Sequence, residues 1–276
     1  MKLRWLIGAG TLSLLGACTE VVTVLDAGSG GSRAVSGGGG SGGEGGNGDS
    51  GGGDSGQGAT DGGEPARGGS GSVTPELGVF VDSGNEHSCA TRYGALYCWG
   101  NGADGRLGLG DERDRDAPTR VGTDSDWTSV ATGVSHTCAL KADGSVWCFG
   151  ANGVGQLGQG STTSSSEPLR VALPGPVTQL SSEADTACVV LESQQLLCWG
   201  RNVEGNIGLN DTHPGENQLS PIRSGSFSDW QSVATGDGHT CGIRGTGLLF
   251  GWGRNTAANL GLGQTTDQQR RSATQI

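Results

Sequence analysis

The sequence has few hydrophobic residues and almost no lysine. Hydrophobic residues make up 33% of the 276 residues, and only Lys2 and Lys141 carry an ammonium side chain. These two shortages exclude a coiled coil and a helical bundle, which are rich in apolar and helix-favouring residues. The apolar run from Trp5 to Leu15 is too short to span about 30 Å of hydrocarbon as a helix.

Positive charge is scarce as well. The chain has 17 Lys and Arg against 28 Asp and Glu, which gives a formal net charge of −11 at pH 7. Loss of residues 1–17, which hold two of the positive charges and no negative one, changes this value to −13. Such a surface repels phosphate backbones. We therefore expect no nucleic-acid partner.

The N-terminus is typical of an exported protein. Lys2 and Arg4 precede the run from Trp5 to Leu15, as the charged and apolar regions of a signal peptide do. The next residues, Gly16-Ala17-Cys18, complete a segment "LGAC" that resembles the lipobox of bacterial lipoproteins. The resemblance implies that residues 1–17 are removed, that Cys18 receives a diacylglycerol thioether, and that its new amino group is acylated, as with palmitate. Several acyl chains on one Cys are sufficient for stable anchoring.

The residue after Cys18 indicates which membrane the lipid would anchor the protein to. Thr19 follows Cys18, and by resemblance to lipoprotein sorting in double-membraned bacteria this favours the outer membrane, facing either the periplasm or the cell surface. The alternative is an ordinary secretory signal in which Cys18 is incidental. Both interpretations predict export.

Glycine is abundant and unevenly distributed. The chain has 56 glycines, of which 22 lie between Gly28 and Gly71 among small and polar residues. That stretch has too little apolar surface to offset the entropy of ordering it. We expect residues 18–74 to be a flexible linker that spans roughly 40 Å, and residues 75–276 to form the folded domain.

Four copies of one unit follow this linker. Each copy has an anchoring cysteine, and these cysteines lie 49, 50 and 53 residues apart at Cys89, Cys138, Cys188 and Cys241. A period near 50 residues, with several short apolar runs bounded by turns in each copy, predicts an all-β fold made of propeller blades. In the second copy we expect strands at residues 118–121, 127–131, 136–141 and 145–149.

The copies resemble a known repeat. The segment "HTCALKADGSVWCFGANGVGQLGQG" at residues 136–160, with "HTC" again at residues 239–241 and "WG.N....LG" beginning at Trp199 and Trp252, is similar to the RCC1 repeat, named for the regulator of chromosome condensation. The resemblance covers about residues 77–276. It implies a β-propeller, which has seven blades in family members. It also implies a function in which loops contact a protein partner, as in exchange factors for a small GTPase, ubiquitin-pathway modules and secreted inhibitors of β-lactamases.

This chain has four copies where the family has seven. The first copy lacks a preceding strand like "PTRV", and residues 271–276 at the C-terminus match that strand. This predicts an RCC1-like propeller of four repeats with one blade split between the two ends of the chain. Three arrangements remain open, namely a closed four-bladed ring, an open arc, and an arc completed by a second molecule as a homodimer.

The cysteine spacing predicts disulfides. A three-residue loop ending in Gly144 sets Cys138 opposite Cys148, and a shorter loop in the first copy keeps the same opposition. Directly opposed cysteines lie within disulfide range. We predict three cross-strand bridges, which pair Cys89 with Cys98, Cys138 with Cys148, and Cys188 with Cys198. In the fourth copy Gly251 replaces the second cysteine, and Cys241 is expected to be a buried thiol.

Residues suited to catalysis are few. His87, His136 and His239 each precede a Cys by two residues, but we expect them to be structural and to bind neighbouring backbone. The aromatic residues at one repeat position, Trp99, Phe149, Trp199 and Trp252, are expected to pack between blades. The sequence predicts no catalytic residue, no cofactor and no metal, so we expect a protein that is not an enzyme.

The most variable connections are the candidate partner-binding loops, at residues 111–117, 161–167 and 211–218. The framework repeats while these loops differ, which favours a binding module that recognises an unknown envelope or extracellular protein. The candidate residues are Asp111, Glu112, Arg113, Asp114, Arg115, Asp116, Asp211, His213 and Glu216. Two alternatives are a hydrolase of envelope polymers that uses these carboxylates, and a non-catalytic, truncated relic of a longer propeller.

Overall fold

The part of the domain that the structure describes contains sixteen strands and one short 3-10 helix. The computed structural model describes residues 79–209, 215–245, 247–263 and 269–276. The predicted signal peptide, Cys18 and the linker lie outside these residues. Within the described part of the chain, no helix is long and apolar enough to cross a membrane.

The strands form four antiparallel sheets, each made of four strands in chain order. The first sheet contains β1 (Phe80–Ser83), β2 (His87–Arg92), β3 (Ala95–Gly100) and β4 (Arg115–Arg120), with the helix η1 (Ala103–Gly105) between the last two. The second contains β5 (Trp127–Thr132), β6 (His136–Lys141), β7 (Val146–Gly150) and β8 (Ser165–Arg170). The third contains β9 (Val177–Glu183), β10 (Thr186–Leu191), β11 (Leu196–Gly200) and β12 (Gln218–Arg223). The fourth contains β13 (Trp230–Thr235), β14 (His239–Arg244), β15 (Leu248–Gly253) and β16 (Arg270–Gln275).

The predicted split blade is wrong. The "PTRV" strand is the end of β4, which pairs with β3 of the preceding copy instead of opening the second copy. The C-terminal strand β16 pairs with β15 in the same way. Every sheet is therefore complete within one continuous stretch of chain, because each outer strand folds back on the hairpin before it.

The central hairpins have the predicted register. Cys89 pairs with Cys98, Cys138 with Cys148 and Cys188 with Cys198 across β2–β3, β6–β7 and β10–β11. All three pairs are disulfide-bonded, with Cα atoms 4.1 Å apart. Gly144 has a φ of 79° at the end of its three-residue loop. A methyl group at this glycine would lie 2.5 Å from Pro176 Cβ. The turn therefore requires glycine both for its backbone conformation and for space.

The fourth hairpin lacks a bridge, as predicted. Cys241 of β14 lies directly opposite Gly251 of β15, and its thiol is free. The thiol is only half-buried, whereas the sequence predicted full burial. Burial still raises its pKa, so the thiol is protonated and weakly nucleophilic at neutral pH.

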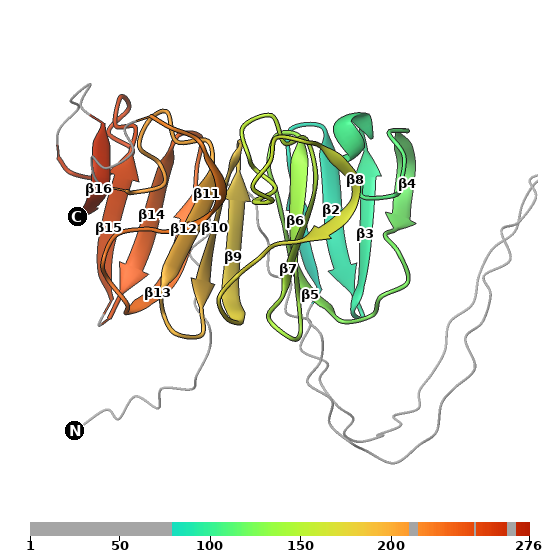
Figure 1. Cartoon of the computed structure of the whole chain (residues 1–276), viewed down its shortest axis with the longest axis horizontal. Coiled ribbons are helices and arrows are strands. Elements are labelled where there is room, and N and C mark those ends of the chain that lie inside the picture. The colour runs from blue at the N-terminus through green and yellow to red at the C-terminus, as the bar shows by residue number, and fades with distance from the viewer. Residues whose placement is uncertain (1–78, 210–214, 246, 264–268) are drawn as a thin grey trace, which may run out of the picture. The chain divides into compact units, whose positions relative to one another are not determined.

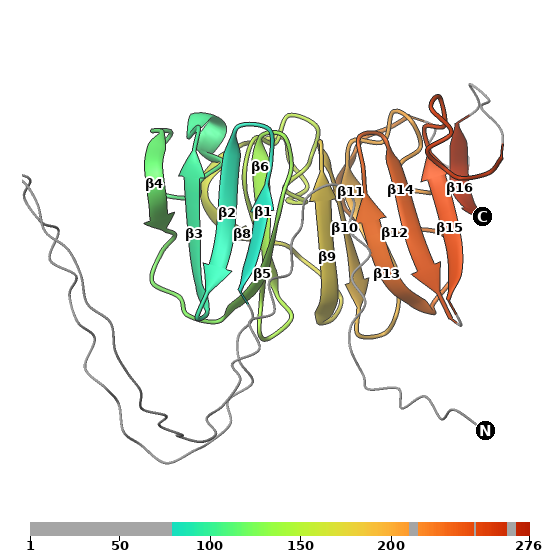
Figure 2. The same ribbon diagram turned by 180° about the vertical axis from the view of Figure 1, so that it is seen from behind.

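Neighbouring sheets pack face to face in chain order, as Figures 1 and 2 show. Strands β1 and β2 contact β5, β5 contacts β9, and β9 and β10 contact β13. We call the face of a sheet that is turned toward the preceding sheet its leading face, and the face turned toward the following sheet its trailing face. Alternate residues of each strand point to these two faces.

Three apolar cores join the sheets. Between the second and third sheets, the disulfide of Cys138 and Cys148 on a trailing face packs with Val189 and Trp199 on the next leading face. The other two cores join the first sheet to the second and the third to the fourth in the same manner. The disulfides thus lie inside the cores between sheets, where their sulfur atoms are fully buried.

Candidate binding face

Two kinds of connection lie at the same end of the strands in each sheet. One is the short turn between the first and second strands, and the other is the long connection between the third and fourth strands. Successive strands are antiparallel, so both lie at one end of the sheet. We call this end the loop face. It comprises the described residues among 84–86, 101–114, 133–135, 151–164, 184–185, 201–217, 236–238 and 254–269, together with Asp82, Asp116 and Glu183 at the adjoining strand ends.

A buried asparagine shapes the long connections. Asn152 donates to the carbonyl oxygens of Ser161 at 3.0 Å and Thr163 at 2.9 Å, and its side-chain oxygen accepts the Leu157 N–H at 3.0 Å. Asn202 and Asn255, at the same repeat position, accept the N–H of Ile207 and Leu260. This asparagine is the fixed residue of the "WG.N" pattern. It satisfies backbone groups that a loop would otherwise leave unpaired.

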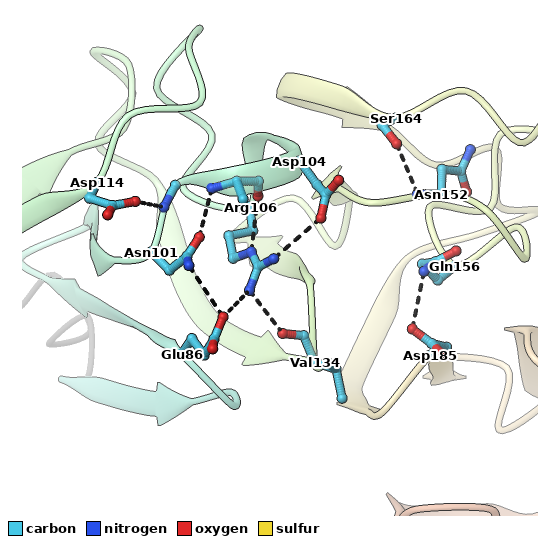
Figure 3. Close-up of polar contacts among 12 residues, drawn as sticks. Glu86, Asn101, Asp104, Arg106, Asp114, Val134, Asn152, Gln156, Ser164 and Asp185 are labelled. Atoms are coloured by element: carbon cyan, nitrogen blue, oxygen red, sulfur yellow. Dashed lines mark hydrogen bonds and ion pairs between the residues drawn. The ribbon is translucent and has the colours of Figure 1, made fainter.

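The first copy has Gly102 at this position and so lacks the side-chain bonds of the asparagine, while a carboxylate accepts its backbone N–H, as Ser164 does for Asn152 in the second copy. The Gly102 N–H donates to Asp114 at 2.9 Å, as Figure 3 shows. A methyl group at Gly102 would lie 2.0 Å from the Arg113 carbonyl oxygen. Asp114, a predicted binding residue, therefore stabilises its own loop.

Arg106 ties the first long connection to the second sheet. Its guanidinium lies 3.4 Å from Glu86 and 3.2 Å from Asp104, and it donates to the Val134 carbonyl oxygen at 3.5 Å (Figure 3). The Arg106 side chain is only 6% exposed, so the charge is held in a semi-enclosed site where pairing matters. The loop face is fixed across the boundary between two sheets.

At the same position in the second copy, a neutral amide replaces the guanidinium as the donor. Gln156 replaces the arginine and donates to Asp185 of the third sheet at 3.1 Å (Figure 3). The geometry of the boundary is retained while its chemistry changes from one copy to the next.

The predicted loop residues divide into structural and exposed ones. Asp111 and Arg115 form an ion pair at 2.9 Å, and the Arg115 guanidinium holds the pKa of the Asp111 carboxyl below its usual range. Glu112, Asp116 and Glu216 are exposed. Asp211 and His213 lie outside the described residues.

Sequence reasoning missed a set of carboxylates at the inner strand ends. Asp82, Glu183 and Asp185 all have a pKa raised above its usual range, mainly by burial. Negative charge on Asp237 adds to the rise for Glu183 and Asp185. These residues come from three different sheets. For Glu183, Asp185 and Asp237 the signal was an acidic residue in the turn before the repeated His or Thr, in "EADT" at residues 183–186 and "GDGH" at residues 236–239.

Asp82 also joins two sheets. Its carboxylate accepts the backbone N–H of Thr132 at 2.7 Å and the hydroxyl of the same residue at 3.0 Å. Charge-assisted bonds of this kind are stronger than neutral ones. They hold the inner ends of β1 and β5 together.

The repeated histidines are structural, but their partners differ from those predicted. His87 Nε2 lies 2.8 Å from the Thr137 hydroxyl, and His136 Nε2 lies 2.9 Å from the Ser182 hydroxyl. Both partners are side chains of the following sheet. Burial lowers the pKa of His87 to about 4 and that of His136 to about 3, so both rings are neutral at pH 7. Among the described residues, no group of three or more His, Cys, Asp or Glu side chains is arranged to hold a metal ion.

The aromatic position packs between sheets in three of the four copies. Phe149, Trp199 and Trp252 are fully buried. The indole N–H of Trp199 donates to the Gln156 carbonyl oxygen and that of Trp252 to the Asn206 carbonyl oxygen, both at 2.9 Å. Trp99, in the first sheet, is only half-buried.

Comparison with known proteins identifies the repeat. Residues 93–140, 143–190 and 194–243 each match the family described as "Regulator of chromosome condensation (RCC1) repeat", and a second description of that repeat matches residues 127–156 and 230–257. The ultraviolet-B receptor UVR8 of Arabidopsis thaliana is 35% identical over 202 residues, which cover 71% of this chain and 46% of that protein.

Solved structures show the same fold. Yeast RCC1 (Prp20), in a complex with Kap60, superposes with a TM-score of 0.64 at 21% identity, over 74% of this chain and 50% of that one. Human WBSCR16 gives a TM-score of 0.63 at 23% identity, over 72% and 53%. The chain thus spans about half the length of the relatives that it matches.

Proposed function

Because this chain belongs to the RCC1 repeat family, we propose that it is a binding module of the bacterial cell envelope that presents its loop face to a protein partner. One observation carries the proposal. The framework of the loop face is held by repeated contacts within and between sheets, while its exposed side chains differ from copy to copy. A surface that is already ordered loses little conformational entropy on binding.

The charges of the loop face favour a partner with basic groups. The inner carboxylates Asp82, Glu183, Asp185 and Asp237 interact with one another across sheets. Burial disfavours the ionised forms of Asp82, Glu183 and Asp185, so an approaching cation stabilises these three carboxylates. We propose that Lys or Arg side chains of the partner lie here, and that the exposed outer residues Glu112, Asp116 and Glu216 add specificity.

The carboxylates of the first predicted loop do not favour a hydrolase. A glycoside hydrolase needs one carboxylic acid with a raised pKa beside a second carboxylate near the scissile bond. In the first predicted loop, Arg115 lowers the pKa of Asp111 and Asp114 is bound to backbone. We therefore propose binding without catalysis, cofactor or metal.

Capture from native envelopes tests this function. The full-length chain is expressed in its host as wild type, as Glu183→Lys at the inner part of the loop face, and as Glu112→Lys at the outer part. Glu192→Lys is the matched control, since Glu192 is exposed in the β10–β11 turn at the opposite edge of the third sheet. We expect proximity labelling to find a partner with wild type and control, and at least tenfold less of it with one or both loop-face variants.

Two results would overturn the proposal. One is that wild type and all variants label the same background of abundant proteins, with no specific partner. The other is that the specific partner is lost equally with Glu192→Lys, which would move the binding surface away from the loop face.

We further propose that the domain is tethered to the outer membrane through lipid on Cys18, at the end of a Gly-rich linker. The support is the "LGAC" segment after a short apolar run, together with three buried disulfides, which are typical of an oxidising compartment. Labelling with a fatty-acid analogue tests it. Cys18→Ala should abolish the label, whereas Cys241→Ala, which removes the other cysteine outside the three bridges, should retain it. Equal labelling of both variants would contradict the assignment.

A further inference from the structure

The three cores between sheets are built from residues at the same repeat positions. Comparison with these cores shows which packing partners the first and fourth sheets lack on their outer faces. In each core a disulfide and a β-strand aliphatic residue lie on a trailing face, and in two of the three cores the residue after the outer strand, Val121 or Val171, joins them. The following leading face supplies an aromatic and an aliphatic residue. The first sheet has no sheet before it, and the fourth has none after it, in the described chain.

The trailing face of the fourth sheet leaves apolar residues exposed. Leu249 is 40% exposed, whereas its equivalents Leu96, Val146 and Leu196 are fully buried. Ile276 is 41% exposed, although its equivalents Val121 and Val171 are at most 3% exposed. These residues, with the half-buried Cys241, form a patch of the kind that the chain covers elsewhere with another sheet.

The leading face of the first sheet is exposed in a complementary way. Val81 is 39% exposed, and its equivalents Val130 and Val233 are buried. Trp99 is half-buried, whereas the equivalent aromatic residues of the other three sheets are fully buried. The first and fourth sheets of one chain therefore do not cover each other at these positions.

We propose that two copies of this chain close a single ring, in which the trailing face of each fourth sheet packs on the leading face of the partner's first sheet. The partner is a second copy of this chain, because the chain itself carries both surfaces that are needed. The fourth sheet lacks a leading face to pack on, and the first sheet lacks a trailing face. Three internal boundaries show that its trailing faces bind its leading faces. The new contact repeats the same pairing of a trailing face with a leading face.

The polar residues of the two end faces match as well. His87 binds the hydroxyl of Thr137 across a boundary, and the equivalent residues at the new boundary are His239 and Ser88. By this equivalence, the Nε2 of His239 is the atom that would meet the Ser88 hydroxyl of the second copy.

The indole of Trp99 also gains a partner. Trp199 and Trp252 each donate to the carbonyl oxygen of the residue that occupies one loop position in the preceding sheet, Gln156 and Asn206. The equivalent residue of the fourth sheet is Asn259. In the ring, the N–H of Trp99 donates to the Asn259 carbonyl oxygen of the second copy.

Symmetry decides between a ring and a fibre. A head-to-tail contact closes if its repeated rotation completes a circle and otherwise grows without limit. Two chains of four sheets give eight blades, which lies within the usual range of about four to eight for propellers. The ring then contains this contact twice, once at each end of a chain, and no end face remains exposed.

A cysteine trap tests the contact. At the first internal boundary, Cys89 Sγ lies 3.7 Å from Thr137 Oγ1, so a cysteine replacing the equivalent Ser88 would meet the free thiol of Cys241 across the new boundary. We expect exported full-length Ser88→Cys to run as a covalent dimer on a non-reducing gel. Ser88→Cys combined with Cys241→Ala should stay monomeric. Ser193→Cys, at an exposed turn on the opposite edge of the third sheet, should give at least tenfold less dimer.

Other products of the trap would overturn the proposal. A bridge between residues 88 and 241 within one chain would show a closed four-bladed ring. A ladder of higher species would show an open filament, and free thiols at both positions would show that the faces do not meet.

A charge on the exposed patch provides a second, independent test. Sedimentation of the detergent-solubilised full-length chain should give a dimer for wild type and a monomer for Leu249→Glu, since a carboxylate is costly at a closed apolar contact. Val203→Glu is the control, because Val203 is 47% exposed on a loop away from both end faces. A monomeric wild type, or a dimer that survives Leu249→Glu, would contradict the ring.

Discussion

Two buried histidines make the stability of the domain depend on pH. Both have a folded-state pKa far below the usual 6.5, about 4 for His87 and about 3 for His136. The unfolded chain therefore binds more protons than the folded chain between these values and 6.5. The stability due to the neutral rings is present above pH 6.5 and is lost as the pH falls.

We expect the free energy of unfolding to fall by about 2 kcal/mol for each histidine between pH 6.5 and 5. The raised pKa values of Asp82, Glu183 and Asp185 act in the opposite direction below that range, because folding then favours their protonated forms. The double variant His87→Gln/His136→Gln keeps an amide that can bond the Thr137 and Ser182 hydroxyls. Urea unfolding at several pH values should give it a flatter profile, and an unchanged slope would show that other groups set the pH dependence.

The sequence predicted residue identities better than residue partners. The histidines were recognised as structural because a repeated residue suits a framework, but a strand pattern does not show which sheet lies opposite. Their hydroxyl partners, Thr137 and Ser182, lie in the following sheet at different strand positions. The carboxylates Glu183 and Asp185 were missed for the same reason, since their proximity to Asp82 and Asp237 arises only when four sheets pack side by side.

At the level of the hairpin, the fourth sheet shows the same strand pairing without a disulfide. Cys241 and Gly251 are directly opposed, as the bridged cysteines of the other sheets are. A side chain at Gly251 would lie 3.3 Å from the Leu260 carbonyl oxygen and 3.4 Å from Ile276 Cδ1. Its φ is not in the left-handed region, so a cysteine is sterically acceptable there with a small adjustment.

We expect Gly251→Cys to form a fourth disulfide and to raise the free energy of unfolding by about 2 kcal/mol, the stabilisation typical of a short loop closed by a bridge. Gly251→Ala is the matched control, because it adds the same Cβ without sulfur. Intact mass should show the loss of two hydrogens, and reductant should remove the gain. Retention of two free thiols would show that the opposed positions do not have disulfide geometry.

Strand order was the weakest part of the prediction at this level. The central hairpins followed from loop length and cysteine spacing, which are local. The outer strand is joined to its sheet by a long connection, and its sequence, such as "PTRV", has no mark of which hairpin it pairs with. In the structure β4 pairs with the preceding hairpin, because the chain folds back along β3 before it enters the next sheet.

Across the whole domain, we expect the backbone amides to differ in their protection from hydrogen exchange. The third sheet is covered on both faces and contains a disulfide, whereas the fourth has no disulfide. Local opening costs less where fewer constraints hold a segment. Hydrogen exchange of the backbone amides should therefore be faster in residues 239–253 than in residues 186–200.

Reduction provides the control for this gradient. Reductant applied under conditions that open the buried bridges removes the disulfide of the third sheet, whereas the fourth hairpin has no disulfide to lose, so the difference in exchange rates should narrow. Equal protection of the two sheets before reduction would contradict a role of the disulfides in the gradient. Exchange that is uniformly fast throughout would instead favour the truncated relic over a stable binding module.

The self-contained sheets also bear on how such a chain changes over evolution. Each sheet uses one unbroken stretch of about 50 residues, and no sheet borrows a strand from the opposite end of the chain. An in-frame duplication or loss of one stretch therefore leaves every remaining sheet whole. Blade number is free to change in single genetic steps, and the exposed end faces decide which of the resulting lengths assemble into a ring.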